Sequence, residues 1–203
     1  MSTCIKRLFI VCMLATLAGC SGLQQAPVPP PVDSAETWDD VQASLQQLNH
    51  WTLDGKIGIR TPDDNQSARL YWQQNAQHYS IELSGPLGQG GLKIEGEPGA
   101  ILLDLGGDDR YVSSSPEQLL QETLGWSLPV QEIRWWVRGL PAPEQPHTAA
   151  FQGPRLQTLS QAGWTIEYQR YQRHQKYTLP GKIKLSHNGL RITLIIKEWS
   201  VRI

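Results

Sequence analysis

The sequence predicts a mainly β protein: one antiparallel sheet of about ten or eleven strands that curls on itself, with three short helices across its opening. Two observations lead to this fold class. Apolar and polar residues alternate in many short runs, and each run is bounded by Gly, Pro, Asn or Asp, which is typical of antiparallel hairpins. Apolar residues recur at helical spacing in two other segments, and a third segment has helix start and stop signals. Because such a sheet has one apolar face, that face must be buried, either in a filled core or around a cavity.

The first twenty residues have the pattern of a bacterial lipoprotein signal. Lys6 and Arg7 form a basic start, and residues 8–17 are an apolar run too short to span a bilayer. The run leads into Leu-Ala-Gly-Cys, which resembles the lipoprotein box in which the sulfur of Cys20 is acylated before cleavage just ahead of it. The alternative is an ordinary secretory signal with a chance cysteine. Ser21, in place of Asp, favours sorting to the outer membrane.

We therefore expect a signal peptide at residues 1–19, a lipidated cysteine and Pro-rich tether at 20–33, and a single domain at 34–203. At roughly 3.1 Å per residue, the tether reaches roughly 35–40 Å. Cys4 and Cys12 leave with the signal, so an acylated Cys20 leaves no free thiol in the mature chain. Removing the two basic residues of the signal changes the net charge from −1 to about −3, so the chain has no basic footprint for nucleic acid.

The sequence predicts three helices, over residues 34–49, 116–124 and 130–138. The first and third are predicted from the helical spacing of apolar residues, and the second from its start and stop signals. Asp33 and Glu36 are spaced as a capping box for the first helix. Ser115 and Gln118 have the same spacing ahead of the second helix, which has Pro at its first position and Gly125 at its end. Each of these helices is short and amphipathic, so each is expected to pack one face on the sheet.

The strands are predicted from alternation with a period of two. Asn188 and Gly189 make a hairpin tip between the last two runs. The alternating apolar positions lie in eight runs, at residues 53–60, 70–72, 79–84, 92–95, 101–105, 164–168, 183–185 and 190–196.

No catalytic or metal-binding motif is present in the sequence. The five histidines lack metal-ligand spacing, and there is no nucleophile elbow. The glycine-rich segment 88–91 lacks the Gly-Lys-Ser/Thr of a phosphate loop and is better interpreted as a hairpin arm. We therefore expect no metal, no cofactor and no enzymatic activity. Trp135 and Trp136 are about 100° apart on a helix, so only one of them can face inward.

Several segments, taken in order, resemble the LolB family of outer-membrane lipoprotein receptors of Gram-negative bacteria. These are the lipoprotein box, Leu-Tyr-Trp-Gln-Gln at 70–74, Gly-Pro-Leu-Gly at 85–88, Trp-Val-Arg-Gly-Leu-Pro at 136–141, and the closing segment from Gly189 to Trp199. The resemblance covers essentially the whole mature chain. Each motif alone is weak, and it is their order that makes the resemblance specific.

The resemblance implies an incomplete antiparallel β-barrel with a lid of helices, anchored by lipid on the periplasmic side of the outer membrane. Its implied partners are the soluble carrier LolA, acylated lipoprotein cargo and outer-membrane phospholipid, with the protein acting as a monomer. The apolar face would then line a cavity for the cargo's acyl chains. The candidate residues for this cavity are Leu53, Ile57, Leu70, Trp72, Ile81, Leu83, Leu92, Ile94, Leu103, Ile192 and Leu194.

The resemblance also gives a role to Leu87, an apolar residue at the tip of the predicted Pro-Leu-Gly turn. In LolB proteins, a leucine on a protruding loop is needed to insert cargo into the membrane. Without the resemblance, an exposed leucine is an ordinary surface residue. A second class of function also fits the composition: a membrane-tethered structural or assembly lipoprotein with a filled β-sandwich core that binds a protein partner.

Overall fold

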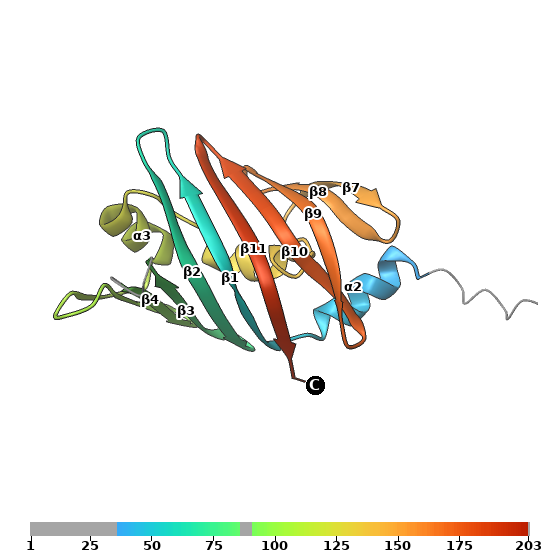
Figure 1. The fold of residues 1–203 in the computed structure, drawn as a ribbon, viewed down its shortest axis with the longest axis horizontal. Coiled ribbons are helices and arrows are strands. Elements are labelled where there is room, and N and C mark those ends of the chain that lie inside the picture. Colours follow the sequence, from blue (N-terminus) through green and yellow to red (C-terminus); the bar gives the residue numbers. More distant parts are fainter. Residues whose placement is uncertain (1–35, 86–90, 203) are drawn as a thin grey trace, which may run out of the picture. The chain divides into compact units, whose positions relative to one another are not determined.

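Eleven antiparallel strands form a single sheet in the computed structural model, which describes residues 36–85 and 91–202. The order of strands across the sheet is β6-β5-β4-β3-β2-β1-β11-β10-β9-β8-β7 (Figure 1). Strands β1 to β6 pair in chain order, strands β7 to β11 do the same, and the pairing of β1 with β11 joins the two halves. The strands are β1 (His50–Arg60), β2 (Asn65–Asn75), β3 (His78–Ser84), β4 (Gly91–Glu97), β5 (Ala100–Asp104), β6 (Arg110–Ser113), β7 (His147–Gln152), β8 (Arg155–Gln161), β9 (Trp164–His174), β10 (Tyr177–His187) and β11 (Leu190–Val201).

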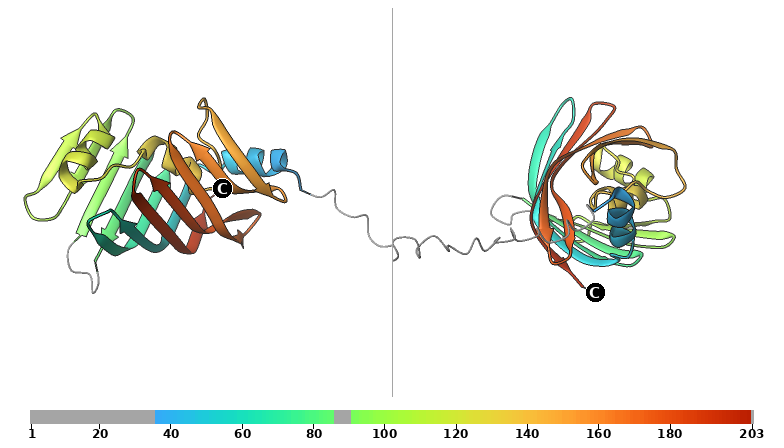
Figure 2. Two further views of the ribbon diagram at one scale, coloured as in Figure 1. Left: turned by 90° about the horizontal axis from the view of Figure 1, so that it is seen from above. Right: turned by 90° about the vertical axis from the view of Figure 1, so that its right-hand side faces the viewer.

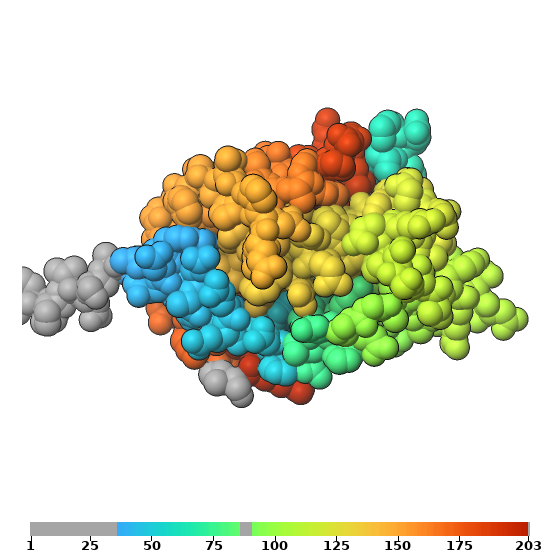
Figure 3. All heavy atoms as spheres, turned by 180° about the vertical axis from the view of Figure 1, so that it is seen from behind, coloured from blue at the N-terminus to red at the C-terminus, as the bar shows by residue number. Residues whose placement is uncertain are grey.

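The sheet curves around its helices without closing, and β6 and β7 are its two edges. The helices are α2 (Trp38–Gln46), α3 (Pro116–Leu124) and α4 (Val130–Trp136). Seen end-on, α2 and α4 lie inside the curve of the strands (Figure 2). In the space-filling view of the side opposite Figure 1, α2 and the yellow segment that carries α3 and α4 cover most of the opening (Figure 3). The predicted unclosed antiparallel sheet with three covering helices is therefore confirmed. Among the described residues, the model has no helix long and apolar enough to cross a bilayer.

The first helix begins later than the sequence predicts. Helix α2 is capped by Thr37, whose hydroxyl accepts from the backbone N–H of Asp40 at 3.3 Å, while the Asp40 carboxylate accepts from the backbone N–H of Thr37 at 3.0 Å. The predicted capping box with Glu36 as its second member is thus wrong, because Glu36 precedes the helix and pairs with Arg155 at 2.7 Å. The helix also ends at Gln46, before the predicted position 49.

The other two helices agree better with prediction. Helix α3 has Pro116 at its start, and Gly125 ends it in the left-handed conformation with φ 76°. The predicted capping box is wrong, because the Ser115 side chain makes no capping hydrogen bond and its backbone N–H donates to the hydroxyl of Ser113 at 3.0 Å. Helix α4 ends two residues before the predicted position 138, and Trp136 is fully buried while Trp135 is half-buried, as expected for neighbours on a helix.

All eight predicted runs lie in strands except for Leu105, which follows the end of β5, and the structure adds β6, β7 and β8. Strands β6 and β7 are edges whose side chains are mostly exposed, so they lack the alternation that marks a half-buried strand. The predicted hairpin tip is confirmed, because Asn188 and Gly189 both have positive φ, at 44° and 86°.

A bulge in the pairing of β1 with β11 falls where the sheet needs a glycine. The register shifts between Asp54 and Gly55. A β-carbon on Gly55 would overlap the backbone carbonyl of Ile195, so only glycine allows the two strands to approach this closely. Bulges of this kind increase local twist and help a sheet to curve.

Candidate functional site

The candidate site is the concave face of the sheet together with the helices that cover it. Cross-strand pairing aligns five of the predicted cavity residues in one row across β1 to β5. Because neighbours in a row point to the same face, residues far apart in sequence form one continuous apolar surface. The row consists of Leu53, Trp72, Ile81, Ile94 and Leu103.

The structure brings all eleven predicted cavity residues into this one cluster, but it gives them different surroundings. Nine of them are buried among other core side chains: Leu53, Ile57, Leu70, Trp72, Ile81, Ile94, Leu103, Ile192 and Leu194. Leu83 and Leu92 are half-buried, and these two, together with Ile57, line open space at one end of the sheet. The predicted set therefore contains both packing residues and cavity residues, which sequence reasoning did not separate.

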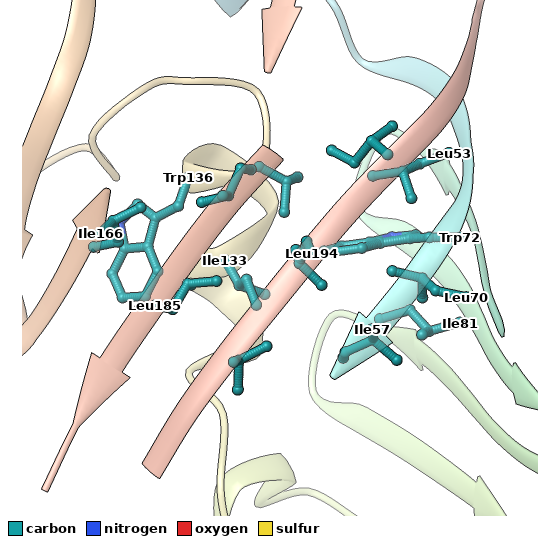
Figure 4. Packing of buried hydrophobic residues seen from close by; sticks show 14 of the residues in the cluster. Leu53, Ile57, Leu70, Trp72, Ile81, Ile133, Trp136, Ile166, Leu185 and Leu194 are labelled. Atoms are coloured by element: carbon teal, nitrogen blue, oxygen red, sulfur yellow. The ribbon is translucent and has the colours of Figure 1, made fainter. Parts of the chain in front are cut away.

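Helix α4 fills the middle of the concave face. Its Val130, Ile133 and Trp136 are buried, and Figure 4 shows Ile133 and Trp136 packed against Leu185 and Ile166 of the sheet. A filled interior of this kind has no room for an acyl chain while α4 remains in place.

A buried amide holds the end of α4 against the sheet. Gln161 on β8 accepts hydrogen bonds from the indole N–H of Trp136 and the backbone N–H of Ala142, both at 2.8 Å. Its amide nitrogen donates to the carbonyl of Ala142 at 2.8 Å and to that of Gln145 at 3.3 Å. Every polar atom of this side chain is thus satisfied, which makes it a specific anchor.

An apolar cavity of about 460 Å³ opens beside α3, at the end of β1 and β2 where their connecting turn lies. Besides the three predicted residues, sequence reasoning missed Ile59, Ala68, Leu124 and Trp126, which also line it. Trp126 lies in the α3–α4 connection, where no periodicity marks it as an inward-facing residue. We call this space the apolar cavity.

A second hollow of about 490 Å³ adjoins the apolar cavity and gives it a polar rim. Both spaces share Ile59, Leu124 and Trp126. The rim adds Asp63 and Asp64 from the β1–β2 turn, and His187 and Asn188 from the β10–β11 turn. An apolar interior with a polar edge is the usual form of a site for an amphipathic ligand.

Helices α3 and α4 are joined by one charged contact near the apolar cavity. The carboxylate of Glu117 on α3 accepts from the backbone N–H of Val130, the first residue of α4, at 3.2 Å. Burial, and then the nearby charge of Glu117, raises the pKa of Tyr79 to about 12, so this hydroxyl is neutral at physiological pH. The contact ties the first turn of α3 to the first residue of α4.

The predicted lipidation site Cys20, the sorting residue Ser21, the tether and the membrane-insertion residue Leu87 lie outside the described residues. Leu83 and Leu92 belong to β3 and β4, the two strands that precede and follow the 86–90 segment in sequence, and both line the apolar cavity. Within residues 36–85 and 91–202, there is no group of three or more His, Cys, Asp or Glu side chains that could hold a metal ion.

Comparison with known proteins gives a consistent result. A family model described as outer membrane lipoprotein LolB matches residues 49–199. The outer-membrane lipoprotein LolB of Pseudomonas aeruginosa is 44% identical over 198 residues, covering 97% of each chain. The corresponding protein of Pseudomonas syringae is 40% identical over 199 residues, covering 98% of this chain and 97% of the relative.

Solved structures support the fold. A LolA superfamily protein from Nitrosomonas europaea superposes with a TM-score of 0.53 at 8% identity, covering 82% of this chain and 94% of that one. A DUF1329 family protein from Desulfovibrio piger gives a TM-score of 0.56 at 6% identity, covering 82% and 92%. At such low identities these likenesses concern the fold alone.

Proposed function

Because this chain belongs to the LolB family, we propose that it accepts acylated lipoproteins from the periplasmic carrier LolA and inserts them into the inner leaflet of the outer membrane. It is a lipid-anchored outer-membrane protein that acts in lipoprotein localisation. We propose Cys20 as its lipidation site and a monomer as its working form. The observation that carries the proposal is the apolar cavity, which adjoins a concave apolar face covered by the short helix α4.

The free energies favour entry of a chain beneath α4. Transferring one sixteen-carbon chain out of water is worth on the order of 12 kcal/mol, at about 0.8 kcal/mol per methylene. Lifting α4 exposes three buried side chains, which costs about 5–9 kcal/mol at roughly 1.5–3 kcal/mol each. An acyl chain that would otherwise be in water therefore offsets the cost of opening, and a chain handed over from the carrier does so only where this site binds it more tightly than the carrier does. No nucleotide hydrolysis is needed if the affinity for the acyl chains increases from the carrier to the receptor and from the receptor to the bilayer.

The route begins at the apolar cavity. Trp126 and Leu124 lie in and beside the α3–α4 connection, so a chain that enters there meets the joint between the two helices first. Movement of α3 and α4 as a pair would expose the concave face from that end. Acyl chains would then occupy the space that α4 fills in the closed form.

The experiment that tests the proposal is a handover assay. The mature chain, residues 20–203 with Cys20→Ala to keep it in solution, is mixed with a carrier–lipoprotein complex, and the elution position of the cargo is measured. Movement of cargo onto this chain supports the receptor function. The amount of cargo transferred should be the same with or without ATP or a protonophore. Cargo that stays on the carrier, with this chain folded, would favour the structural lipoprotein with a filled core.

Delivery to the membrane has a separate test at Leu87. We propose that this leucine enters the lipid and orients the site, contributing about 1.5–3 kcal/mol. Leu87→Glu should accept cargo from the carrier at the normal rate but should release it to liposomes at least tenfold more slowly. Leu87→Ile is the matched control and should deliver normally. Normal delivery by Leu87→Glu would show that insertion of this residue is not required.

A further inference from the structure

A second pocket, of a different chemical character, lies at the other end of β1 and β2. It has a volume of about 230 Å³ and is lined by Asn49, Trp51, Gln77, Arg134, Trp135 and Arg138, among others. Trp51 lines this pocket and Ile57 lines the apolar cavity; they are six residues apart on β1, which separates them by about 20 Å at about 3.3 Å per residue. We call it the cationic pocket, because its lining includes two arginines and no acidic residue.

Trp51, one of the residues that line the cationic pocket, has an indole N–H without an acceptor. Trp51 is only 2% exposed, and its ring packs between those of Trp72 at 5.1 Å and Trp199 at 5.2 Å. Its indole N–H is buried and donates to nothing within the described residues. A buried donor without a partner is costly, and such groups are usually satisfied by water, an ion or a ligand.

The lining of the cationic pocket also carries two guanidinium groups on the same aromatic ring. The central carbons of Arg138 and Arg134 lie 4.5 and 5.7 Å from the centroid of Trp135. Neither arginine has a carboxylate within 4.0 Å in residues 36–85 and 91–202, where every ion pair involves other residues. Two cations held together without a counter-charge repel each other, and an anion between them would remove that repulsion.

Arg138 is fixed in place by the backbone. It is 3% exposed, and one terminal nitrogen donates to the carbonyls of Leu45 and Leu48 at 3.2 and 2.6 Å. Its Nε donates to the carbonyl of Arg134 at 3.0 Å. Burial, followed by the charge of Arg134, lowers the pKa of Arg138 to about 10, so it remains charged at neutral pH. The guanidinium is therefore a preorganised, permanently positive wall.

We propose that the cationic pocket binds a phosphate group, supplied either by free inorganic phosphate or by the headgroup of a phospholipid. Arginine and indole N–H groups both donate to phosphate oxygens, and a phosphate can accept from donors on several sides at once. A pocket of this size holds about seven water molecules at roughly 30 Å³ each, which suits a small anion and excludes a long acyl chain. The bound group would join α4 to the start of β1.

The proposal is tested by thermal unfolding of the mature chain carrying Cys20→Ala. Inorganic phosphate is compared with chloride at matched ionic strength, and dihexanoyl phosphatidylglycerol with an uncharged hexyl glucoside. At ten times its dissociation constant, phosphate should raise Tm by about 3–6 °C. A shift with phosphate alone identifies the free anion, and a larger shift with the phospholipid identifies the headgroup.

Variants distinguish this pocket from general salt effects and from binding at the apolar cavity. Arg134→Gln should abolish the shift, and Trp51→Phe, which keeps the ring and removes the donor, should weaken binding at least fivefold. Arg110→Gln removes an exposed arginine on β6 and should leave the shift unchanged. The proposal is overturned if neither phosphate source raises Tm, or if the shift survives Arg134→Gln.

Discussion

Replacing Ile133 with alanine should weaken the fold and strengthen acyl-chain binding at the same time. Ile133 is 4% exposed on α4 and packs on the concave face (Figure 4). Its truncation should cost about 2–5 kcal/mol of stability, which lowers Tm by about 2–4 °C per kcal/mol for a chain of this length. The substitution removes three carbons that must be exposed when α4 lifts. Exposing each carbon costs about 0.8 kcal/mol, so their removal lowers the free-energy cost of lifting α4 by about 2 kcal/mol. The affinity for an acyl chain that binds beneath α4 should rise by about thirtyfold.

The assay is displacement of a bound hydrophobic dye by palmitate, with unfolding by urea measured on the same samples. The matched control is Ile101→Ala, an isoleucine on β5 that is 1% exposed and should cost similar stability. Because β5 lies toward the opposite edge of the sheet from β9 and β10, which carry the Ile166 and Leu185 packed against α4 (Figure 4), its truncation should change palmitate affinity less than about threefold. Equal affinity gains in the two variants would show that general loosening, and not lifting of α4, admits the ligand.

Three further predictions concern the stability of the fold. Gln161→Leu removes the anchor of α4 and leaves the indole N–H of Trp136 and the backbone N–H of Ala142 without an acceptor. The free energy of unfolding, measured in urea, should therefore fall by about 2–4 kcal/mol. A loss below about 1 kcal/mol would contradict the anchoring role of Gln161. Gly96→Ala should cost about 1–3 kcal/mol, because its β-carbon would overlap the ring of Tyr79, whereas Gly58→Ala, with nothing closer than 4.0 Å, should cost less than Gly96→Ala. Burial lowers the pKa of His174, so the unfolded chain binds a proton before the native one does, and stability should decline as pH falls from 7.5 to 5. His174→Gln should reduce that slope, and an unchanged slope would contradict the assignment.

The number of helices and the starts of α3 and α4 were predictable, but the start of α2 was not. Asp33 with Glu36 and Thr37 with Asp40 both have the spacing of a capping box, so local sequence does not choose between them. The contact between Glu36 and Arg155 joins residues 119 apart, and a contact this distant in sequence has no local signal. The edge strands were missed for a related reason, since an exposed strand such as β6, where Val112 is 75% exposed, has no buried face to produce alternation.

The concave face was predictable because alternation decides which side of a strand each residue occupies. The sequence did not predict which of those residues border open space, because that depends on where the helices lie. Leu53 and Leu83 have the same pattern in sequence, yet Leu53 is fully buried and Leu83 is half-buried beside the apolar cavity. Trp126, a lining residue in a connection without periodicity, could be found only from the structure.

The most direct test of the account is hydrogen exchange of the α4 backbone, residues 130–136, with and without bound acylated cargo. If acyl chains displace α4 from the concave face, its amides should exchange at least tenfold faster in the cargo complex, while the amides of Ile183 and Leu185 on β10 stay protected. If the α4 amides are as protected with cargo bound as without it, acyl chains do not bind beneath this helix. That result would contradict the proposal that they displace α4 from the concave face.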